Sequence, residues 1–314
     1  CVTIESVLLS TKAEQARLSP SVSTRCSRIV RLCRRERRVL CVSQMRPPLQ
    51  PFPMEGRRRA QAWRYQPQFR RPRHFHDQSE LNLVTRGIGR FVVGNTELVL
   101  SAGQVIGFVP GCEHELVAAS DDLELFAIGF EPDLLRAYQR ECGLALCFGG
   151  TPTRVDRGEL GRIRELCLSV DESRDRLSLE SQLLAVANTL TRKPREMPLG
   201  WRAATAIAGD PEHTRDELTR LLRSNRGDVS RALQRDLGTT LPLFKNRVRL
   251  LDFIRRLDQG LSMTTAARLS GFGSYSQCHR AFLQLFGQAP RQFMRSTLRE
   301  ELAQRFEPLI ARVR

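Results

Sequence analysis

Short apolar runs, separated by Gly and Asn, dominate the chain between about residue 60 and residue 130. The pair Gly94–Asn95 is typical of a two-residue hairpin turn between strands. Several short strands at this spacing predict a small antiparallel barrel or jelly roll. The expected strands are Glu80–Val84, Gly89–Val93, Thr96–Leu100, Gln104–Val109 and Leu123–Phe130.

After residue 130 the apolar positions recur every three or four residues, which predicts amphipathic helices. The expected helices of this stretch are Pro132–Arg140, Gly158–Val170 and Leu179–Leu190. The broad apolar stripe of the last one is typical of a core face or of a dimer face, and the sequence does not separate these two.

The last third of the chain contains an internal repeat. The octapeptide starting at Arg231 is echoed by the octapeptide starting at Arg280, and Phe244 and Phe293 keep the same offset of 49 residues. This predicts two copies of a helix-turn-helix unit. The expected helix pairs are Arg215–Leu222 with Arg226–Leu237, and Met263–Ser270 with Ser274–Phe286.

A single amphipathic helix, Leu241–Gln259, is expected between the two copies, with Thr240 as its N-cap. About 18 residues at roughly 1.5 Å each give about 27 Å. Successive major grooves on one side of DNA lie about 34 Å apart, so this helix could hold two recognition helices in adjacent grooves. Its polar face is expected to offer basic side chains to phosphates: Lys245, Arg247, Arg249, Arg255 and Arg256.

The second helix of each copy presents polar residues near its N-terminal half, where a recognition helix touches base edges. We expect base or phosphate contacts from Arg226, Gly227, Asp228, Ser230 and Arg231, and from Ser274, Tyr275, Ser276, Gln277, His279 and Arg280. Arginine to guanine is the most specific contact available to them. A helical bundle with merely solvated basic residues is the alternative, and it leaves the repeat unexplained.

Net charge supports a polyanionic partner. The chain carries +16, distributed as +13 over residues 1–73, −6 over residues 74–198 and +9 over residues 199–314. A basic last third beside an acidic middle indicates one domain that meets nucleic acid and one that does not. A nonspecific nucleic-acid binder would show the same charge, but it would have no preference among DNA sequences.

Nine cysteines occur without any CxxC pair, which disfavours a zinc ribbon and indicates a reduced, cytoplasmic protein. No apolar run is long enough to predict a membrane span. Residues 1–59 are expected to form a basic, disordered tail. Two interpretations of residues 1–53 stay open: an arm that binds phosphates, or a mis-set translation start, with Met45 or Met54 as the true beginning.

A second motif lies in the predicted barrel. His74, His76, Glu80 and His114, with Gly87, Gly103 and Pro110–Gly111 at set intervals, resemble the two motifs of the cupin fold. In metal-binding cupins such residues converge on one divalent ion, although Ala118 stands where an Asn is often found. Three interpretations stay open: a metal-free pocket for a small effector, which we favour, a metal site, and a barrel without ligand. No cofactor is therefore expected.

Residues 200–297 resemble the paired helix-turn-helix domain of the AraC/XylS family of bacterial regulators. The resemblance rests on the pattern of Gly271–Phe293 and on Asn246, Arg249 and Leu250 of the linking helix. It departs from the family at Gly227, Ala266, Gly273 and Cys278; Gly273 stands where a Ser or Thr helix cap is usual. The family often pairs this domain with a cupin-like domain for effector binding and dimerisation.

The resemblance implies an α+β protein with four parts: the tail, a cupin-like domain at 60–150, linking helices at 151–198 and a double helix-turn-helix domain at 199–314. The expected function is sequence-specific transcription regulation under a small-molecule effector, without enzymatic activity. The expected partners are double-stranded DNA, RNA polymerase and a second copy of the chain. The alternative is a metal-dependent cupin enzyme, a dioxygenase or an isomerase, using His74, His76, Glu80 and His114.

Overall fold

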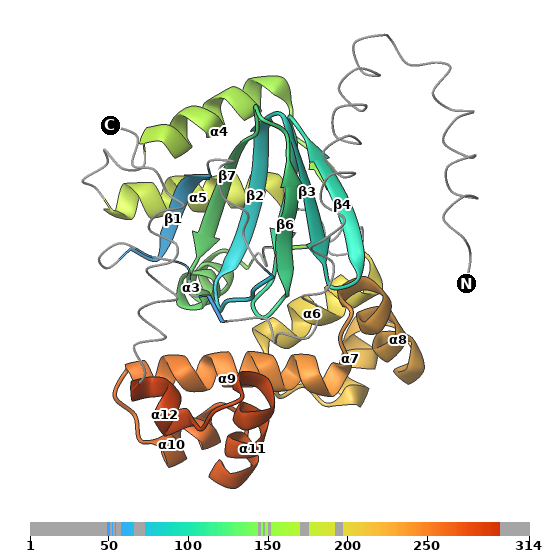
Figure 1. Cartoon of the computed structure of the whole chain (residues 1–314), viewed down its shortest axis with the longest axis vertical. Coiled ribbons are helices and arrows are strands. Elements are labelled where there is room, and N and C mark those ends of the chain that lie inside the picture. The colour runs from blue at the N-terminus through green and yellow to red at the C-terminus, as the bar shows by residue number, and fades with distance from the viewer. Residues whose placement is uncertain are drawn as a thin grey trace. The chain divides into compact units, whose positions relative to one another are not determined.

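The computed structural model describes residues 49–50, 52, 54, 58–65, 73–143, 146, 148–149, 152–169, 176–191 and 197–295. All of them belong to one compact unit, residues 46–314 (Figure 1). Nearly all of the predicted tail lies outside the described residues. Among the described helices, none is both long enough and apolar enough to cross a membrane.

The first half of the described chain forms two antiparallel sheets. The five-stranded sheet has the order β1-β7-β2-β5-β8, and the three-stranded sheet has the order β4-β3-β6 (Figure 1). The strands are β1 (Ala60–Tyr65), β2 (Ser79–Arg86), β3 (Ile88–Val93), β4 (Thr96–Ser101), β5 (Gln104–Phe108), β6 (His114–Ala119), β7 (Glu124–Phe130) and β8 (Thr153–Arg154). The hairpin predicted at Gly94–Asn95 joins β3 to β4 with the register Val93 opposite Thr96.

The two sheets are not closed into one continuous barrel, and the prediction of a small, antiparallel, cupin-like β structure is confirmed. Among the described strands no ladder joins the two sheets, and the edge of β5 pairs with β8, with Gln104 opposite Arg154. Each sheet also carries a register shift, at Val84/Arg86 and at Arg90/Phe91, and such irregularities bend strands away from an even cylinder. The fold class is α+β, as predicted.

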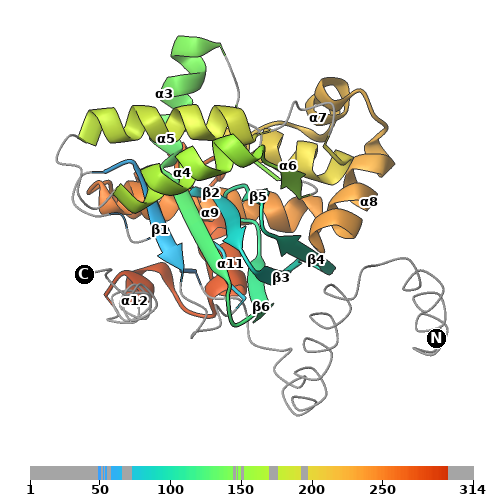
Figure 2. The ribbon, with the colours of Figure 1, turned by 90° about the horizontal axis from the view of Figure 1, so that it is seen from above.

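Three helices accompany the strands: α3 (Pro132–Cys142) lies between β7 and β8 in the chain, and α4 (Arg157–Ser169) and α5 (Arg176–Leu190) follow β8. Figure 2 shows α4 and α5 running across β1. We name the strands β1–β8 together with helices α3–α5 the β-domain. The apolar stripe of α5 is buried in its core, through Leu179, Leu183, Val186, Ala187 and Leu190. Of the two interpretations left open for this stripe, the core face is therefore the one observed.

The last described third is all helical. It comprises α6 (Leu199–Gly209), α7 (Arg215–Leu222), α8 (Arg226–Leu237), α9 (Leu241–Asp258), α10 (Met263–Leu269), α11 (Tyr275–Phe286) and α12 (Pro290–Arg295). The bounds of α7 and α8 are those predicted from the sequence. Two helix-turn-helix units, α7–α8 and α10–α11, lie at the two ends of α9 (Figure 1).

Side-chain caps set the starts of these helices. Thr214 and Glu217 form a reciprocal capping box on α7, and Thr240 accepts from the Leu243 amide at the start of α9. The cap of α11 is Ser274, which accepts from the Gln277 amide at 3.2 Å. The expectation that Gly273 occupies this cap is therefore wrong by one residue, because the polar side chain that reaches the free amide belongs to Ser274.

The described residues form two large hydrophobic cores and one small one around Phe52 and Trp63, and α9 contributes to both large cores. The first joins the β-domain to α6, α7 and α8 and includes Phe244 and Val248 of α9. The second surrounds α10 and α11 and includes Phe253 of α9 together with Phe75, which precedes β2. Each helix-turn-helix unit thus shares buried apolar surface with the β-domain.

Candidate functional site

Four polar side chains predicted from the sequence meet inside the β-domain; we name them the His–Glu cluster (His74, His76, Glu80 and His114). Their exposed fractions are 0, 1, 0 and 3%. One ligand atom from each lies within 4.8 Å of the others. His74 and His114 are joined by an antiparallel bridge, with N–O distances of 3.1 and 3.0 Å, so the backbone itself brings the two motifs together.

Glu80, on β2, is the centre of the cluster. Its Oε2 lies 2.7 Å from Nε2 of His76 and 3.2 Å from Nε2 of His114. Its Oε1 accepts a hydrogen bond from Nδ2 of Asn82 at 2.8 Å. One carboxylate oxygen is thus held by an amide, and the other faces two imidazole rings.

The other nitrogen of each of these two rings faces a backbone carbonyl. Nδ1 of His76 lies 2.8 Å from the carbonyl oxygen of Gln78, and Nδ1 of His114 lies 3.1 Å from that of Cys112. Because a carbonyl only accepts, each Nδ1 carries the hydrogen, and a neutral ring then turns its Nε2 lone pair toward the Glu80 carboxylate. Lone pairs on both sides require a cation between them, either a proton or a metal ion.

Apolar rings enclose the cluster. Phe108 stacks on His114 with ring centroids 4.2 Å apart and an interplanar angle of 14°, and Phe52 meets His76 edge-on at 5.3 Å. Imidazoles and a carboxylate are ligands that Zn, Fe, Mn or Ni accept. The residues present therefore fit a divalent transition metal, whereas four ligand atoms within 4.8 Å leave no room for an organic molecule among them.

The predicted contact residues of the first unit lie on α8, but most of its charge is already paired. Arg226 forms an ion pair with Asp216 of α7, and Arg231 forms one with Asp228 at 2.6 Å on the same helix. Arg226, Gly227 and Arg231 are exposed, and Asp228 and Ser230 are half-buried. This face is therefore polar and accessible, and an acidic residue sits within it.

The second unit presents a more open face on α11. Ser274, Ser276, Gln277 and Arg280 are exposed. Among the described residues, none forms an ion pair with Arg280. Tyr275 is half-buried, its hydroxyl donates to Sδ of Met263 at 3.3 Å, and its ring lies 5.9 Å from that of His279, also half-buried. Tyr275 thus packs partly within its own unit.

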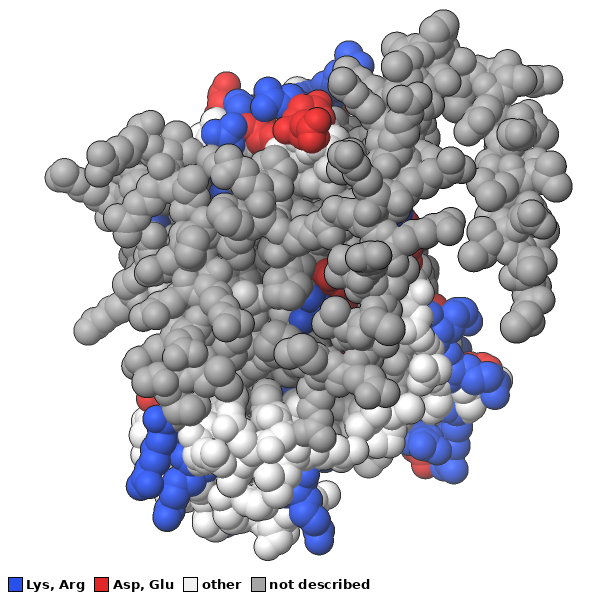
Figure 3. All heavy atoms as spheres, viewed as in Figure 1, with Lys and Arg blue, Asp and Glu red and all other residues white. Residues whose placement is uncertain are grey.

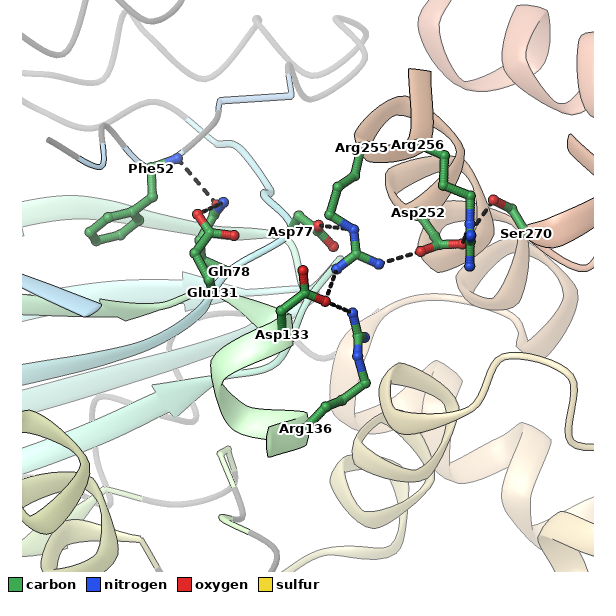
Figure 4. Close-up of polar contacts among 10 residues, drawn as sticks. All are labelled: Phe52, Asp77, Gln78, Glu131, Asp133, Arg136, Asp252, Arg255, Arg256 and Ser270. Carbon is green, nitrogen blue, oxygen red and sulfur yellow. Dashed lines mark hydrogen bonds and ion pairs between the residues drawn. The ribbon is translucent and has the colours of Figure 1, made fainter. Parts of the chain in front are cut away.

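Two of the five basic side chains of α9 face the β-domain and not the phosphate-binding face expected from the sequence. Arg247 is only 8% exposed and binds the β-domain through Gly111 and Glu113. Arg255 pairs with Asp77 and Asp133 of the β-domain (Figure 4). The expectation is wrong for these two arginines, because acidic residues beside the cluster histidines attract them. Asp77 and Glu113 each neighbour a cluster histidine in sequence, and that was the available signal.

Lys and Arg side chains stand in separate groups at the edges of the helical part in the view of Figure 3. The pale surface between them carries neither sign of charge. The described surface in this view therefore offers several basic points rather than one continuous stripe.

Comparisons with known proteins assign both parts of the chain. A family model described as the AraC-like ligand binding domain matches residues 57–187, and a helix-turn-helix domain model matches residues 218–296. No curated protein matches the chain.

Several solved structures are similar. ToxT from Vibrio cholerae O395 has 14% sequence identity and a TM-score of 0.38, covering 75% of this chain and 96% of that chain. An apo form of ToxT from Vibrio cholerae strain SCE256, with one lysine replaced by alanine, has 13% identity and a TM-score of 0.37, covering 77% and 98%. A DNA-binding transcriptional dual regulator from Escherichia coli K-12 has 19% identity and a TM-score of 0.29, covering 35% and 96%.

The two matched domains stand in the order in which the structure places the β-domain and the two helix-turn-helix units. This combination favours a regulator over the metal-dependent enzyme considered from the sequence. The chain belongs to the AraC family of transcription regulators, as a DNA-binding protein with an effector-binding domain.

Proposed function

We propose that the protein recognises one specific double-stranded DNA site by placing α8 and α11 in successive major grooves. The observation that carries this proposal is the repeat itself, because two like units are fixed at the two ends of one 18-residue helix. A single recognition helix would need no such rod. In this assignment α9 is a spacer, and its buried arginines serve the β-domain rather than DNA.

Base reading is assigned mainly to α11. Arg280 has the length and the donors to bind guanine in a bidentate manner, and Gln277 and Ser276 lie on the same exposed surface. Ser274 and His279 are assigned to neighbouring phosphates. Tyr275 contributes through its half-buried ring.

The face of α8 is assigned a weaker share of the readout. Arg226 and Arg231 are tied to carboxylates in the free protein, and Gly227 offers no side chain. Ser230 and Asp228 complete this surface. We expect phosphate contacts to dominate here, because arginines that exchange a carboxylate for a phosphate gain little sequence information.

The β-domain is proposed to bind the effector at the His–Glu cluster and to bias DNA binding. We further propose that the protein acts on transcription in the cytoplasm through RNA polymerase and as a homodimer, without catalysing a reaction. Sedimentation of the protein with and without its DNA site tests whether it forms a homodimer. A polymerase pull-down on that site tests the other partner.

Selection from a random duplex library, with the full chain as bait, tests the proposal. We expect enrichment of two sequence blocks whose centres are about 10–10.5 base pairs apart. Enrichment of a single block would show that one unit does not read DNA. Retention of all sequences equally, in both the presence and absence of divalent metal ions, would refute sequence-specific recognition.

A further inference from the structure

The segment that brings His74 and His76 to the cluster uses its other face to hold the helical domain. Side chains of an extended segment point alternately to opposite sides. His74 and His76 point into the cluster, whereas Phe75 and Asp77 contact helices of the DNA-binding domain. A shift of either histidine therefore shifts a residue that α9 or α11 touches.

Phe75 is the apolar contact of this segment. It is fully buried, and its ring centroid lies 6.3 Å from that of Phe286, the last residue of α11. The guanidinium of Arg247 on α9 lies over the Phe75 ring, 5.0 Å from the ring centroid. One side chain between two cluster histidines thus touches both a recognition helix and the helix that spaces the two units.

Asp77 begins a polar chain to the second unit (Figure 4). Its carboxylate lies 3.7 Å from Arg255 of α9. Arg255 also pairs with Asp252 on the same helix, and Asp252 accepts from the hydroxyl of Ser270 at 2.8 Å, directly after α10. The contacts run from the cluster segment through α9 to the turn of the second helix-turn-helix unit.

The segment that carries His114 makes a parallel connection. Two residues of this segment bind Arg247: the carbonyl oxygen of Gly111 accepts at 2.8 Å, and the carboxylate of Glu113 forms an ion pair. The second oxygen of Glu113 is held by Arg73 at 2.7 Å, next to His74. Both histidine segments therefore end on the same arginine of α9.

We infer that the effector is a divalent transition-metal ion held by His74, His76, Glu80 and His114. Binding of this ion changes the contacts that Phe75, Asp77 and Glu113 make with α9 and α11. The inference deepens the proposed function and rests on it for the DNA readout. Oε2 of Glu80 faces an imidazole nitrogen from each histidine segment, so an ion bound among these three atoms is held by both segments and by β2 at once. Binding of the ion resets the spacing between β2 and both histidine segments, because the ion replaces the direct contacts of 2.7 and 3.2 Å. The intervening residues move with them, because they share one backbone.

Cobalt titration of the full chain, after treatment with a chelator, tests the metal site. We expect one Co²⁺ per chain with a visible d–d absorption band, and we expect His114→Ala and Glu80→Gln to lose it. His213→Ala removes a histidine outside the cluster and should keep the band. A missing band, or a band that survives both cluster variants, would overturn the metal assignment.

Hydrogen exchange measured with and without Co²⁺ tests the connection independently of DNA. We expect amides of α9 and α11 to change their exchange rates when the ion binds. The double variant Glu113→Gln with Asp77→Asn should keep the cobalt band and lose this change. Glu97→Gln, which breaks an exposed ion pair with Arg90 on the same domain, is the matched control and should behave as the parent protein.

DNA affinity gives the second readout. On the selected site, Co²⁺ should change the dissociation constant by about fivefold or more, and the double variant should show no change. Unchanged exchange in α9 and α11 with the cobalt band present would overturn the connection. Failure to select any DNA would instead count against the proposed function, since the exchange experiment needs no DNA.

Discussion

Arg247 on α9 donates a hydrogen bond to the carbonyl oxygen of Gly111 at 2.8 Å, three residues before His114. The helix that spaces the two DNA-binding units is therefore bound directly to the loop that carries a candidate ligand. The side chain of Arg247 is almost fully buried, and its guanidinium forms an ion pair with Glu113. Removing one partner of a buried pair leaves the other charge uncompensated.

Arg247→Ala should consequently lower the free energy of unfolding by about 2–4 kcal/mol. We expect a loss near the lower end of this range, because Arg73 still forms an ion pair with Glu113 in the variant. Arg90→Ala, at an exposed ion pair with Glu97, should cost less than about 1 kcal/mol and serves as the control. Urea unfolding at pH 7 measures both. Equal losses in the two variants would mean that the Arg247 contact is not a buried ion pair in solution.

Arg280→Ala should weaken binding to the selected DNA site by about 1–3 kcal/mol and relax the preference at one base pair. The reason is that Arg280 is exposed and, among the described residues, forms no ion pair that competes with DNA. Fluorescence anisotropy on the site and on single-base variants measures the loss. Arg162→Ala on α4, an exposed arginine outside the helix-turn-helix units, is the control. Unchanged affinity and unchanged base preference would refute the assignment of α11 to the major groove.

Asp228→Asn should strengthen DNA binding by about three- to tenfold and make the salt dependence steeper by about one unit. The hydrogen bond from Arg231 holds the pKa of Asp228 below its usual range, so this half-buried side chain is negative on the proposed DNA-facing surface. Its replacement removes one repulsive charge and frees Arg231 for phosphate. Binding titrations at several salt concentrations check this, with Asp122→Asn in the β-domain as control. A weaker complex would place Asp228 in a contact that DNA needs.

Glu124→Gln should destabilise the β-domain by about 1–3 kcal/mol at pH 7. Hydrogen bonds from Arg164 and Thr85 and the charge of Arg64 lower the pKa of Glu124 from 4.5 to about 2. A depressed folded-state pKa stabilises the protein above pH 4.5, and this stability is lost as the pH falls toward 2. The deficit of the variant should therefore shrink below pH 4.5 in denaturation curves. A deficit independent of pH would trace it to packing instead of charge.

Glu131→Gln should have the opposite pH dependence. Burial raises the pKa of Glu131 from 4.5 to about 7, and the nearby charge of Asp77 adds to the shift. The folded state then holds a proton that the unfolded state releases, so stability falls as the pH rises from 4.5 to 7. The variant keeps an acceptor for Gln78 and should gain about 1–3 kcal/mol relative to the parent protein at pH 8, but not at pH 4. Glu97→Gln is the control; equal pH profiles of Glu131→Gln and parent would refute the shift.

Local signals made α7, α8 and the hairpin at Gly94–Asn95 predictable from the sequence. Capping residues, a helical period and a turn dipeptide act within a few residues of one another, so they are visible in the linear chain. The repeat also located both helix-turn-helix units. The resemblance to the two cupin motifs implied that the residues of the His–Glu cluster meet, and the structure brings them together.

What the sequence did not predict depends on contacts between distant segments. Helix α6 was not expected, because its buried face consists largely of small residues, Gly200, Ala203 and Ala204, instead of the large aliphatic residues that mark an amphipathic helix. Strand β6 was missed because its outward positions are only half-buried. The small strand β8, which pairs with β5, is two residues long and has no signal of its own. The partners of Arg247 and Arg255 lie more than 100 residues away in sequence.

The side chains on the two faces of residues 74–77 can be substituted separately, although a movement of the shared backbone moves both faces. If the cluster binds the effector as proposed, substitutions at His74 or His76 alter what is bound and leave the side chains of Phe75 and Asp77, which contact α11 and α9, unchanged. Related proteins could therefore respond to new effectors through substitutions of the cluster residues alone, while the residues that contact α9 and α11 stay the same and keep the same DNA recognition.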